Sequence, residues 1–175
     1  QIVDIDLSKN SKLQDLSCYN NQLNRLSVQL NTELIEIYCF SNKLNKLDVD
    51  NNPVLEKLGC NNNLIDYLDI SKNTNLIELW VYNNKLASLN LANGINEDMA
   101  LIEAYNNPEL SCIKVDNENY SEANWRKDPF KFDPQHKFNE NCGPCDEWRE
   151  KLKSNFLINA NACVDETIHL IDYSK

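Results

Sequence analysis

The stretch LIEIYCFSNKLNKLDVDNNPV, residues 34–54, is followed directly by LEKLGCNNNLIDYLDISKNTN, residues 55–75, and the two align without a gap. Leucine opens both units, and Leu13 and Leu76 open the units on either side, so the period is 21 residues. A fixed period of this length indicates a repeat architecture, in which each unit buries its apolar face only by stacking on its neighbours.

Apolar residues and Asn hold fixed positions in both halves of each unit. The first half reads L-x-x-L-x-C-x-x-N-x-L, with the columns Leu16/Ile37/Leu58/Leu79, Cys18/Cys39/Cys60/Val81, Asn21/Asn42/Asn63/Asn84 and Leu23/Leu44/Ile65/Leu86. The second half has the columns Leu26/Leu47/Leu68/Leu89, Val28/Val49/Ile70/Leu91 and Asn31/Asn52/Asn73. A fifth unit arrives two residues late, with Met99, Ile102, Ala104 and Asn107.

This spacing predicts the local structure of each turn. Alternate residues of a strand point to opposite sides, so L-x-L indicates a short strand with two inward side chains. The recurring Asn offers a donor and an acceptor to backbone groups where the chain leaves the strand, and we interpret it as a structural ladder. Because Gly is scarce, at three residues, left-handed turn positions are expected to fall to Asn. The second half predicts an extended or 3₁₀ return path rather than a full helix.

The pattern resembles the leucine-rich repeat, over about residues 2–110. The resemblance implies a leucine-rich-repeat solenoid, a right-handed and β-rich coil of about five turns with a helix-poor outer face. Ile5, Leu7 and Asn10 belong to the second half of a unit, so the chain opens inside a repeat. Since no N-terminal cap is visible, we expect further repeats or another domain upstream in the parent polypeptide.

Three of the seven cysteines, Cys18, Cys39 and Cys60, share one inward column. A metal site of three cysteines is one interpretation of that column. Val81 and Ala104 continue it, however, which shows that the position requires a small apolar residue and favours buried free thiols.

The other four cysteines, Cys112, Cys142, Cys145 and Cys163, lie beyond the repeats. An even number in a polar, non-repetitive tail predicts two disulfides and an oxidising compartment. Cys142-Gly143-Pro144-Cys145 also matches the thioredoxin redox motif. Redox chemistry is the less favoured alternative, because no βαβ pattern surrounds the motif and no Trp precedes it.

The region after the repeats resembles the C-terminal cap of secreted bacterial leucine-rich-repeat proteins. The resemblance is carried by LSCIKVD at 110–116, Tyr120-Ser121, Asn124-Trp125 and FNENC at 138–142. It implies a Cys112–Cys142 disulfide and a location that is extracellular, at the cell surface or periplasmic, in a Gram-negative bacterium. Cys145 would then pair with Cys163.

We therefore expect three regions, with repeats over residues 1–110 and a small α+β, disulfide-linked cap over 111–145. An appended segment over 146–175 is predicted to hold an amphipathic helix around 146–157 and a strand around 167–173.

The candidate site is the outward side of the predicted strands, on the concave face. The column before Cys18 and its equivalents holds Ser17, Tyr38, Gly59, Trp80 and Glu103, and the column after holds Tyr19, Phe40, Asn61, Tyr82 and Tyr105. A neighbouring column of Asp15, Glu36, Lys57 and Glu78 gives this field a mainly acidic rim. The predicted ligand-binding residues are Tyr19, Tyr38, Phe40, Trp80, Tyr82, Tyr105, Asp15, Glu36, Glu78 and Glu103.

Contiguous exposed aromatics indicate a binding surface, and Tyr and Trp are frequent interface anchors. The sequence thus predicts a non-enzymatic extracellular binding module for a protein partner with basic or amide-rich chemistry. A polysaccharide is the alternative ligand, since sugar rings stack on aromatics. A passive spacer in a larger surface protein is the second alternative, because aromatics also stabilise sheets that bind nothing.

Several other functions are disfavoured. The net charge of -10 opposes nucleic-acid binding, and no apolar run is long enough for membrane insertion. No metal or other cofactor is predicted: a calcium stack along Asp6, Asp48, Asp69 and Asn90 is interrupted by Ser27, and turn hydrogen bonds explain the acids more simply. The two histidines, His136 and His169, have no partner at a recognisable catalytic spacing.

Overall fold

The structure, a computed structural model, describes residues 1–142. Residues 1–140 form one compact unit. The predicted Cys145–Cys163 pair, the helix around 146–157 and the strand around 167–173 lie outside the described residues.

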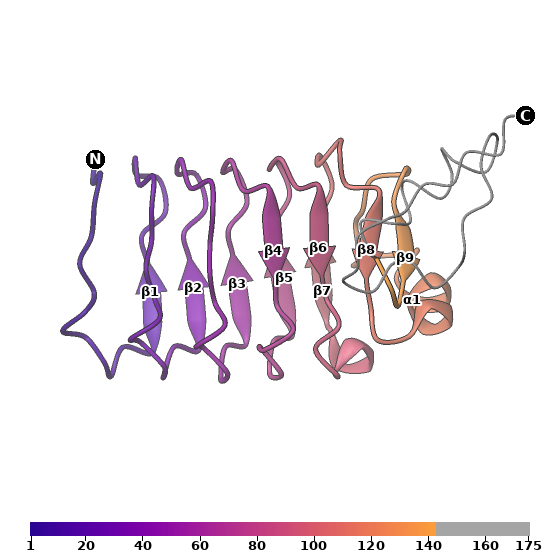
Figure 1. The fold of residues 1–175 in the computed structure, drawn as a ribbon, viewed down its shortest axis with the longest axis horizontal. Helices are drawn as coiled ribbons and strands as arrows, with labels where there is room; N and C mark the ends of the chain where they lie inside the picture. Colours follow the sequence, from indigo (N-terminus) through magenta and orange to yellow (C-terminus); the bar gives the residue numbers. More distant parts are fainter. Residues whose placement is uncertain (143–175) are drawn as a thin grey trace, which may run out of the picture. The chain divides into compact units, whose positions relative to one another are not determined.

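The first halves of the repeats form a parallel sheet, sheet A, which stacks one strand per turn (Figure 1). Its strands in order are β1 (Asp15–Ser17), β2 (Glu36–Tyr38), β3 (Lys57–Gly59), β5 (Glu78–Trp80) and β7 (Leu101–Glu103). Leu58 pairs with Leu79, which keeps the 21-residue period, whereas Leu79 pairs with Ile102. The two extra residues of the fifth unit are therefore absorbed in the loop between strands, and the strand register is preserved.

The second halves form another parallel sheet, sheet B, on the other side of the coil. Its strands in order are β4 (Tyr67–Asp69), β6 (Ser88–Asn90), β8 (Cys112–Lys114) and β9 (Lys137–Asn139). Of the two expected forms of the return path, extended or 3₁₀, the structure shows the extended one, and in the later turns it pairs into a sheet. The described residues hold one α-helix, α1 (Glu118–Asn124), and a 3₁₀ turn, η1 (Asn96–Asp98), in the irregular loop. The outer side is helix-poor, as predicted.

The apolar columns fill the space between the two sheets. Leu34, Leu55 and Leu76, which open successive units, are fully buried, as are Leu44, Ile65 and Leu86. Burying a Leu or Ile side chain stabilises the fold by roughly 1.5–3 kcal/mol. Because each column contacts its equivalents one turn away, this stabilisation depends on neighbouring turns.

The predicted Asn ladder is confirmed and links each turn to the one before it. Nδ2 of Asn63 donates to the carbonyl of Cys60 in its own turn at 3.0 Å and to that of Cys39 in the preceding turn at 3.1 Å. Its Oδ1 accepts from the backbone N–H of Leu44 at 3.0 Å. Asn42, Asn84 and Asn107 repeat this arrangement.

The Asn column of the second half forms another ladder, a role that its sequence position did not reveal. Nδ2 of Asn52 donates to the carbonyls of Val28 and Asn31 in the preceding turn, at 3.1 and 2.8 Å. Asn31 and Asn73 do the same in their turns. On both sides of the coil, buried Asn amides therefore hydrogen-bond each turn to the preceding one.

Left-handed backbone recurs once per turn, immediately before the first ladder. These residues are Asn20, Ser41, Asn62, Asn83 and Asn106, with φ between 54° and 56°. Four of the five are Asn, which confirms that Asn supplies the left-handed positions in this glycine-poor chain.

After residue 110 the chain continues both sheets instead of forming a separate layer, so the solenoid has about six turns. Lys131 bridges Glu103 at the end of sheet A, and β8 and β9 extend sheet B. Cys112 and Cys142 form the expected disulfide. Trp125, only 1% exposed, packs with Phe130, Phe132 and Phe138 over the last turn.

Candidate binding surface

The outward side of sheet A, together with the residues that follow its strands, forms the surface that we call the aromatic face. In β5, Leu79 is fully buried, while Glu78 and Trp80 on either side of it point outward and are half-buried. The structure places all six predicted aromatics on this face: Tyr19, Tyr38, Phe40, Trp80, Tyr82 and Tyr105. Tyr19 is exposed and the other five are half-buried, so each ring reaches the surface.

Stacking between neighbouring turns orders these rings. Tyr19 lies on Phe40 with ring centroids 4.4 Å apart and planes 5° from parallel. Tyr82 lies on Tyr105 in the same way, at 4.7 Å and 4°. Offset parallel rings at such distances attract one another beyond their buried area. The face therefore carries two parallel ring pairs, separated by the turn that contains Asn61.

That middle turn contributes no aromatic residue to this face, and the two columns differ there. In the first, Tyr38 and Trp80 lean toward each other across Gly59, to a centroid distance of 6.3 Å. A Cβ on Gly59 would lie 2.9 Å from Cδ1 of Tyr38, so glycine is required for this approach. In the second column, no ring from residues 1–142 fills the space above Asn61.

A hollow of ≈ 310 Å³ lies over Asn61, bounded by the neighbouring rings. Its lining comprises Tyr38, Phe40, Ser41, Gly59, Asn61, Asn62, Trp80 and Tyr82. Asn61 is only 5% exposed, and within residues 1–142 no hydrogen bond ends on its side-chain amide. The hollow thus combines aromatic walls with an amide floor that can still bond to a ligand.

The rim of the face is less acidic than the sequence indicated, because two of its carboxylates are paired with lysines. Glu36 lies 3.2 Å from Nζ of Lys57, and Glu103 lies 2.7 Å from Nζ of Lys131. In the described part of the chain, neither Asp15 nor Glu78 makes an ion pair. These two carboxylates are therefore the acids of the rim that remain open to a partner's cation.

The electrostatics of the face follow from burial and these pairs. Burial raises the pKa of Tyr38, and the charge of Glu36 adds to the rise. Burial and Glu103 raise the pKa of Tyr105 in the same way. Both phenols stay protonated near neutral pH and can donate hydrogen bonds.

The inward cysteine column carries buried free thiols, as predicted. Burial raises the pKa of Cys18 to about 11 and that of Cys60 to about 12, and it raises the pKa of Cys39 still more strongly from the ordinary value. A thiol that resists ionisation is a poor nucleophile and a poor metal ligand. Among the described residues, no group of three or more His, Cys, Asp or Glu is placed to hold a metal ion.

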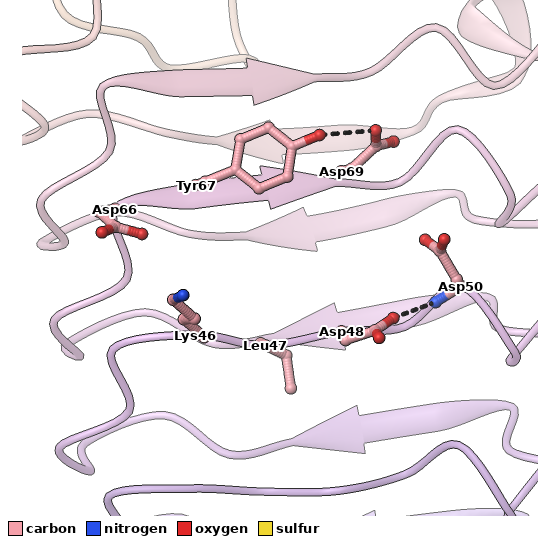
Figure 2. Close-up of a pocket in the computed structure, with 7 residues that line it drawn as sticks. All are labelled: Lys46, Leu47, Asp48, Asp50, Asp66, Tyr67 and Asp69. Carbon is pink, nitrogen blue, oxygen red and sulfur yellow. Dashed lines mark hydrogen bonds between the residues drawn. The ribbon is translucent and has the colours of Figure 1, made fainter.

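On the side of sheet B, a hollow of ≈ 470 Å³ is lined by acids (Figure 2). Asp48 accepts from the backbone N–H of Asp50 at 3.0 Å, and Asp69 accepts from that of Ser71 at 2.8 Å and from the Tyr67 hydroxyl. Asp6 and Asn90 form the same turn, because each accepts a hydrogen bond from the backbone N–H two residues later. Turn formation therefore explains the column of Asp6, Asp48, Asp69 and Asn90.

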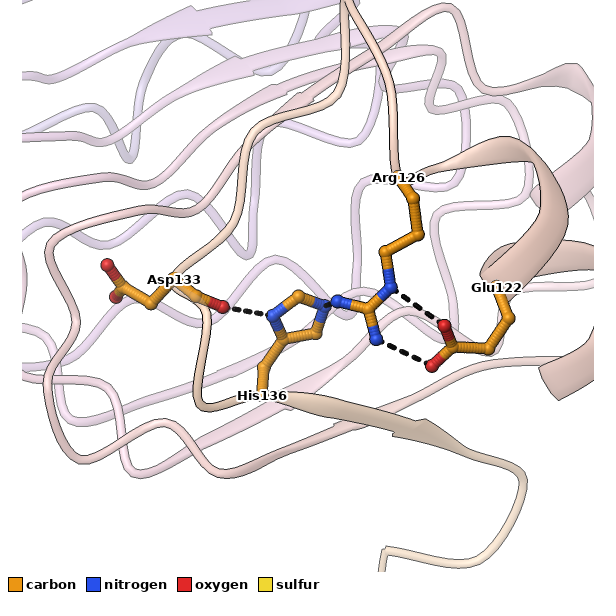
Figure 3. Close-up of polar contacts among 4 residues, drawn as sticks. All are labelled: Glu122, Arg126, Asp133 and His136. Atoms are coloured by element: carbon orange, nitrogen blue, oxygen red, sulfur yellow. Dashed lines mark hydrogen bonds and ion pairs between the residues drawn. The ribbon is translucent and has the colours of Figure 1, made fainter.

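His136 belongs to the packing of the last turn, where a polar chain crosses from α1 (Figure 3). Glu122 accepts two hydrogen bonds from the guanidinium of Arg126, at 2.6 and 2.7 Å. Nη1 of Arg126 donates to Nε2 of His136 at 2.8 Å, and Nδ1 of His136 contacts the carbonyl of Asp133. This arrangement requires a neutral imidazole, and burial lowers the pKa of His136 accordingly.

The two stacked parallel sheets, the 21-residue turns and the Asn ladder define a leucine-rich-repeat solenoid. No protein-family model and no curated protein sequence matches the chain. Among solved structures, the chain is similar to the functional domain of InlJ from Listeria monocytogenes, which includes a cysteine ladder. The identity is 33%, the match covers 65% of this chain and 22% of that chain, and the TM-score is 0.47. Within residues 1–142, no helix has the length and hydropathy needed to span a bilayer.

Proposed function

We propose that the chain is a non-enzymatic binding module that recognises a protein partner through the aromatic face. The observation that carries the proposal is the set of six partly exposed rings on one side of sheet A, ordered by stacking. They are arranged around a hollow whose floor is the Asn61 amide, which has no hydrogen bond to any described residue. Tyr and Trp supply large contact area at low entropic cost, which makes them frequent centres of protein interfaces.

Charge favours a partner with basic residues. Asp15 and Glu78 stand on the face without ion pairs among the described residues, and the net charge of the chain is -10. A cationic partner gains from both the local carboxylates and the overall field, which mainly increases the association rate. A neutral polysaccharide gains nothing from this charge, so the glycan alternative ranks second.

A displayed random-peptide library and a glycan array, each probed with the chain and its variants, test the proposal. We expect peptides with basic and aromatic residues to be enriched. Trp80→Ala and Tyr38→Ala should each weaken the selected peptides by about 30-fold or more, as for interface hot spots of about 2 kcal/mol. Tyr67→Ala is the matched control, because Tyr67 is 50% exposed on sheet B and away from the aromatic face.

The outcomes separate the hypotheses. If the chain binds glycans instead of peptides, and Trp80→Ala weakens that binding to the same extent, the ligand of the aromatic face is a polysaccharide. Binding that survives both substitutions, or no binding in either assay, would leave the aromatic face without a recognition role and would favour a spacer.

The proposed location is extracellular, at the cell surface or periplasmic, in a Gram-negative bacterium. The Cys112–Cys142 disulfide supports an oxidising compartment, since such bonds rarely persist in a reducing cytosol. The bacterial cell surface is supported by the resemblance of the region after residue 110 to caps of secreted repeat proteins. Surface biotinylation of intact cells followed by fractionation would test it, and recovery only from the cytosol would contradict it.

A further inference from the structure

One position is missing from an otherwise continuous row of rings. The column after the cysteines holds Tyr19, Phe40, Asn61, Tyr82 and Tyr105, one residue per turn. The first two rings stack on each other and so do the last two, at 4.4 and 4.7 Å. The row is interrupted only at Asn61, and the hollow of ≈ 310 Å³ lies at this interruption.

The spacing of the strands sets what can enter. Paired strands lie about 4.8 Å apart, so Phe40 and Tyr82, two turns apart, are separated by roughly 9.6 Å along the coil. A flat ring placed midway would lie about 4.8 Å from each, within the range of stacked aromatic pairs. The chain itself shows that a flat aromatic ring fits one such spacing, in Tyr19 on Phe40 and in Tyr82 on Tyr105.

In the adjacent column, two rings of the protein close the equivalent gap over Gly59, whereas the rings next to Asn61 do not close theirs. Over Gly59, Tyr38 and Trp80 lean together to 6.3 Å and occupy the middle turn themselves. Over Asn61, the rings on either side stay stacked on their outer neighbours. The side-chain amide of Asn61, 5% exposed and without a hydrogen bond in the described residues, forms the floor of the hollow.

We infer that the hollow over Asn61 is a slot for one aromatic side chain of a protein partner, which inserts between Phe40 and Tyr82 and completes the row of five rings. The inference rests on the proposed function and deepens it by naming the anchor. The Asn61 amide favours a ring with a polar edge, a Tyr hydroxyl or a Trp N–H. Glu78, on the strand of Trp80 and without an ion pair in the described chain, favours a Lys or Arg close to that ring in the partner.

The slot can be tested with a defined probe, N-acetyl-L-tyrosinamide, added to the ¹⁵N-labelled full chain. We expect the side-chain amide signal of Asn61 to shift and to saturate with a Kd of about 1 mM, typical of the efficiency of a small ligand. N-acetyl-L-leucinamide, which has no ring, should bind at least tenfold more weakly. Methyl β-D-glucoside serves as the sugar arm.

Asn61→Tyr is the informative variant, because it fills the slot with a ring that belongs to the chain, as the four other turns do. It should keep the fold and reduce probe binding at least tenfold. Tyr82→Ala removes one wall and should weaken the probe in the same direction, which keeps the test decisive if the first variant folds poorly. Tyr67→Ala, on sheet B, should leave probe binding unchanged.

The inference is overturned if about 10 mM of the tyrosinamide leaves the Asn61 signal unmoved, a concentration well above the expected Kd. Equal probe binding by Asn61→Tyr, or a glucoside that displaces the tyrosinamide, would overturn it too. If the selected peptides no longer bind Trp80→Ala but still bind Asn61→Tyr, the slot is excluded and the aromatic face remains the binding site. If the peptides bind both variants as tightly as the unmodified chain, the proposed function is excluded as well.

Discussion

At the scale of single residues, the fold depends on asparagine more than on any other polar residue. The same residue type occupies two buried ladders and four of the five left-handed positions, because its short amide can both donate and accept and because it tolerates positive φ. The first ladder was predictable from the motif alone. The second was not, since its column lacks a strand signature and only the stacked geometry shows which carbonyls it reaches.

Asn63→Ala is expected to lower the free energy of unfolding by about 2–4 kcal/mol. The substitution leaves the N–H of Leu44 and the carbonyls of Cys39 and Cys60 without the partner they have at 3.0–3.1 Å. Urea unfolding monitored by circular dichroism measures the change. Asn45→Ala is the matched control because Asn45 is exposed, and it should shift stability by no more than about 0.5 kcal/mol. Equal effects in the two variants would contradict the ladder's role.

Ser41→Asn is expected to stabilise the chain by about 0.5–1 kcal/mol, since Ser41 has φ 55° where the other four turns have Asn. The new amide would also stand next to Asn62, in a row where Asn83 already donates to Asn62 at 2.7 Å and Asn106 to Asn83 at 2.7 Å. Thermal and urea unfolding give the difference. Ser41→Val, with a β-branched side chain in a left-handed position, should destabilise instead, and a gain in stability from it would refute the argument.

At the scale of elements, the repeats and a disulfide-linked end with α and β elements could be predicted, but not that this end continues both sheets. The expected small α+β end is present, and its β8, β9 and Lys131 also continue both sheets for another turn. The reason is that these strands pair through backbone groups of the preceding turn, which the side-chain pattern of the sequence does not reveal. Asp133 shows this, because its carboxylate accepts the N–H of Asn106 at 2.8 Å, where Asn83 one turn earlier donates to the carbonyl of the next turn. The same carboxylate accepts the N–H of Asn107 at 2.6 Å.

The last turn should lose stability as the pH falls below about 6.5, the ordinary pKa of histidine. Burial lowers the pKa of His136 in the folded chain, so the unfolded chain binds the proton more tightly, and folding is favoured fully only above the unfolded pKa. Protonation would also remove the acceptor for Arg126 and place two cations together. The hydrogen bond from Arg126 lowers the pKa of Glu122. Protonation of Glu122 therefore causes a further loss of stability as the pH falls below its ordinary pKa of 4.5.

Amide hydrogen exchange of α1 and β9 between about pH 7 and pH 5 would measure this loss, after correction for the intrinsic pH dependence of exchange. His136→Asn, which cannot take up the proton, should flatten the dependence in that window. His169→Asn is the control for the second histidine of the chain. An unchanged pH profile in His136→Asn would assign the effect to other groups.

At the scale of the whole molecule, the aromatic face arises from the register of the stack. Each ring is contributed by a different turn, so no local segment contains the site, and only the 21-residue alignment brings Phe40 and Tyr82 into one row. The sequence therefore predicted which side chains share the face. It could not predict that Glu36 and Glu103 would be neutralised, or that Tyr38 and Trp80 would meet across Gly59, because these contacts depend on side-chain conformations.

The cysteine column gives a built-in measure of how such a stack opens. Stability in a solenoid is a sum of nearest-neighbour interfaces, so a turn that its neighbours cover less completely opens more often. Cys18 is 5% exposed in a turn whose neighbouring Leu7 and Leu16 are 9% and 6% exposed, whereas Cys39 and Cys60 are fully buried. After the repeats, the Cys112–Cys142 disulfide and the Trp125 cluster hold the last turns together.

Alkylation by iodoacetamide at neutral pH should therefore modify Cys18 first, then Cys39 and last Cys60, because each thiol must be uncovered before its raised pKa returns to the ordinary range. Peptide mass spectrometry over time gives the three rates, and labelling in concentrated urea, where all three thiols are equally exposed, provides the normalisation. Equal native rates would mean that the coil opens as one cooperative unit rather than turn by turn. Fastest labelling at Cys60 would mean that the disulfide end is the weaker one, and the cap would then not be what stabilises the stack.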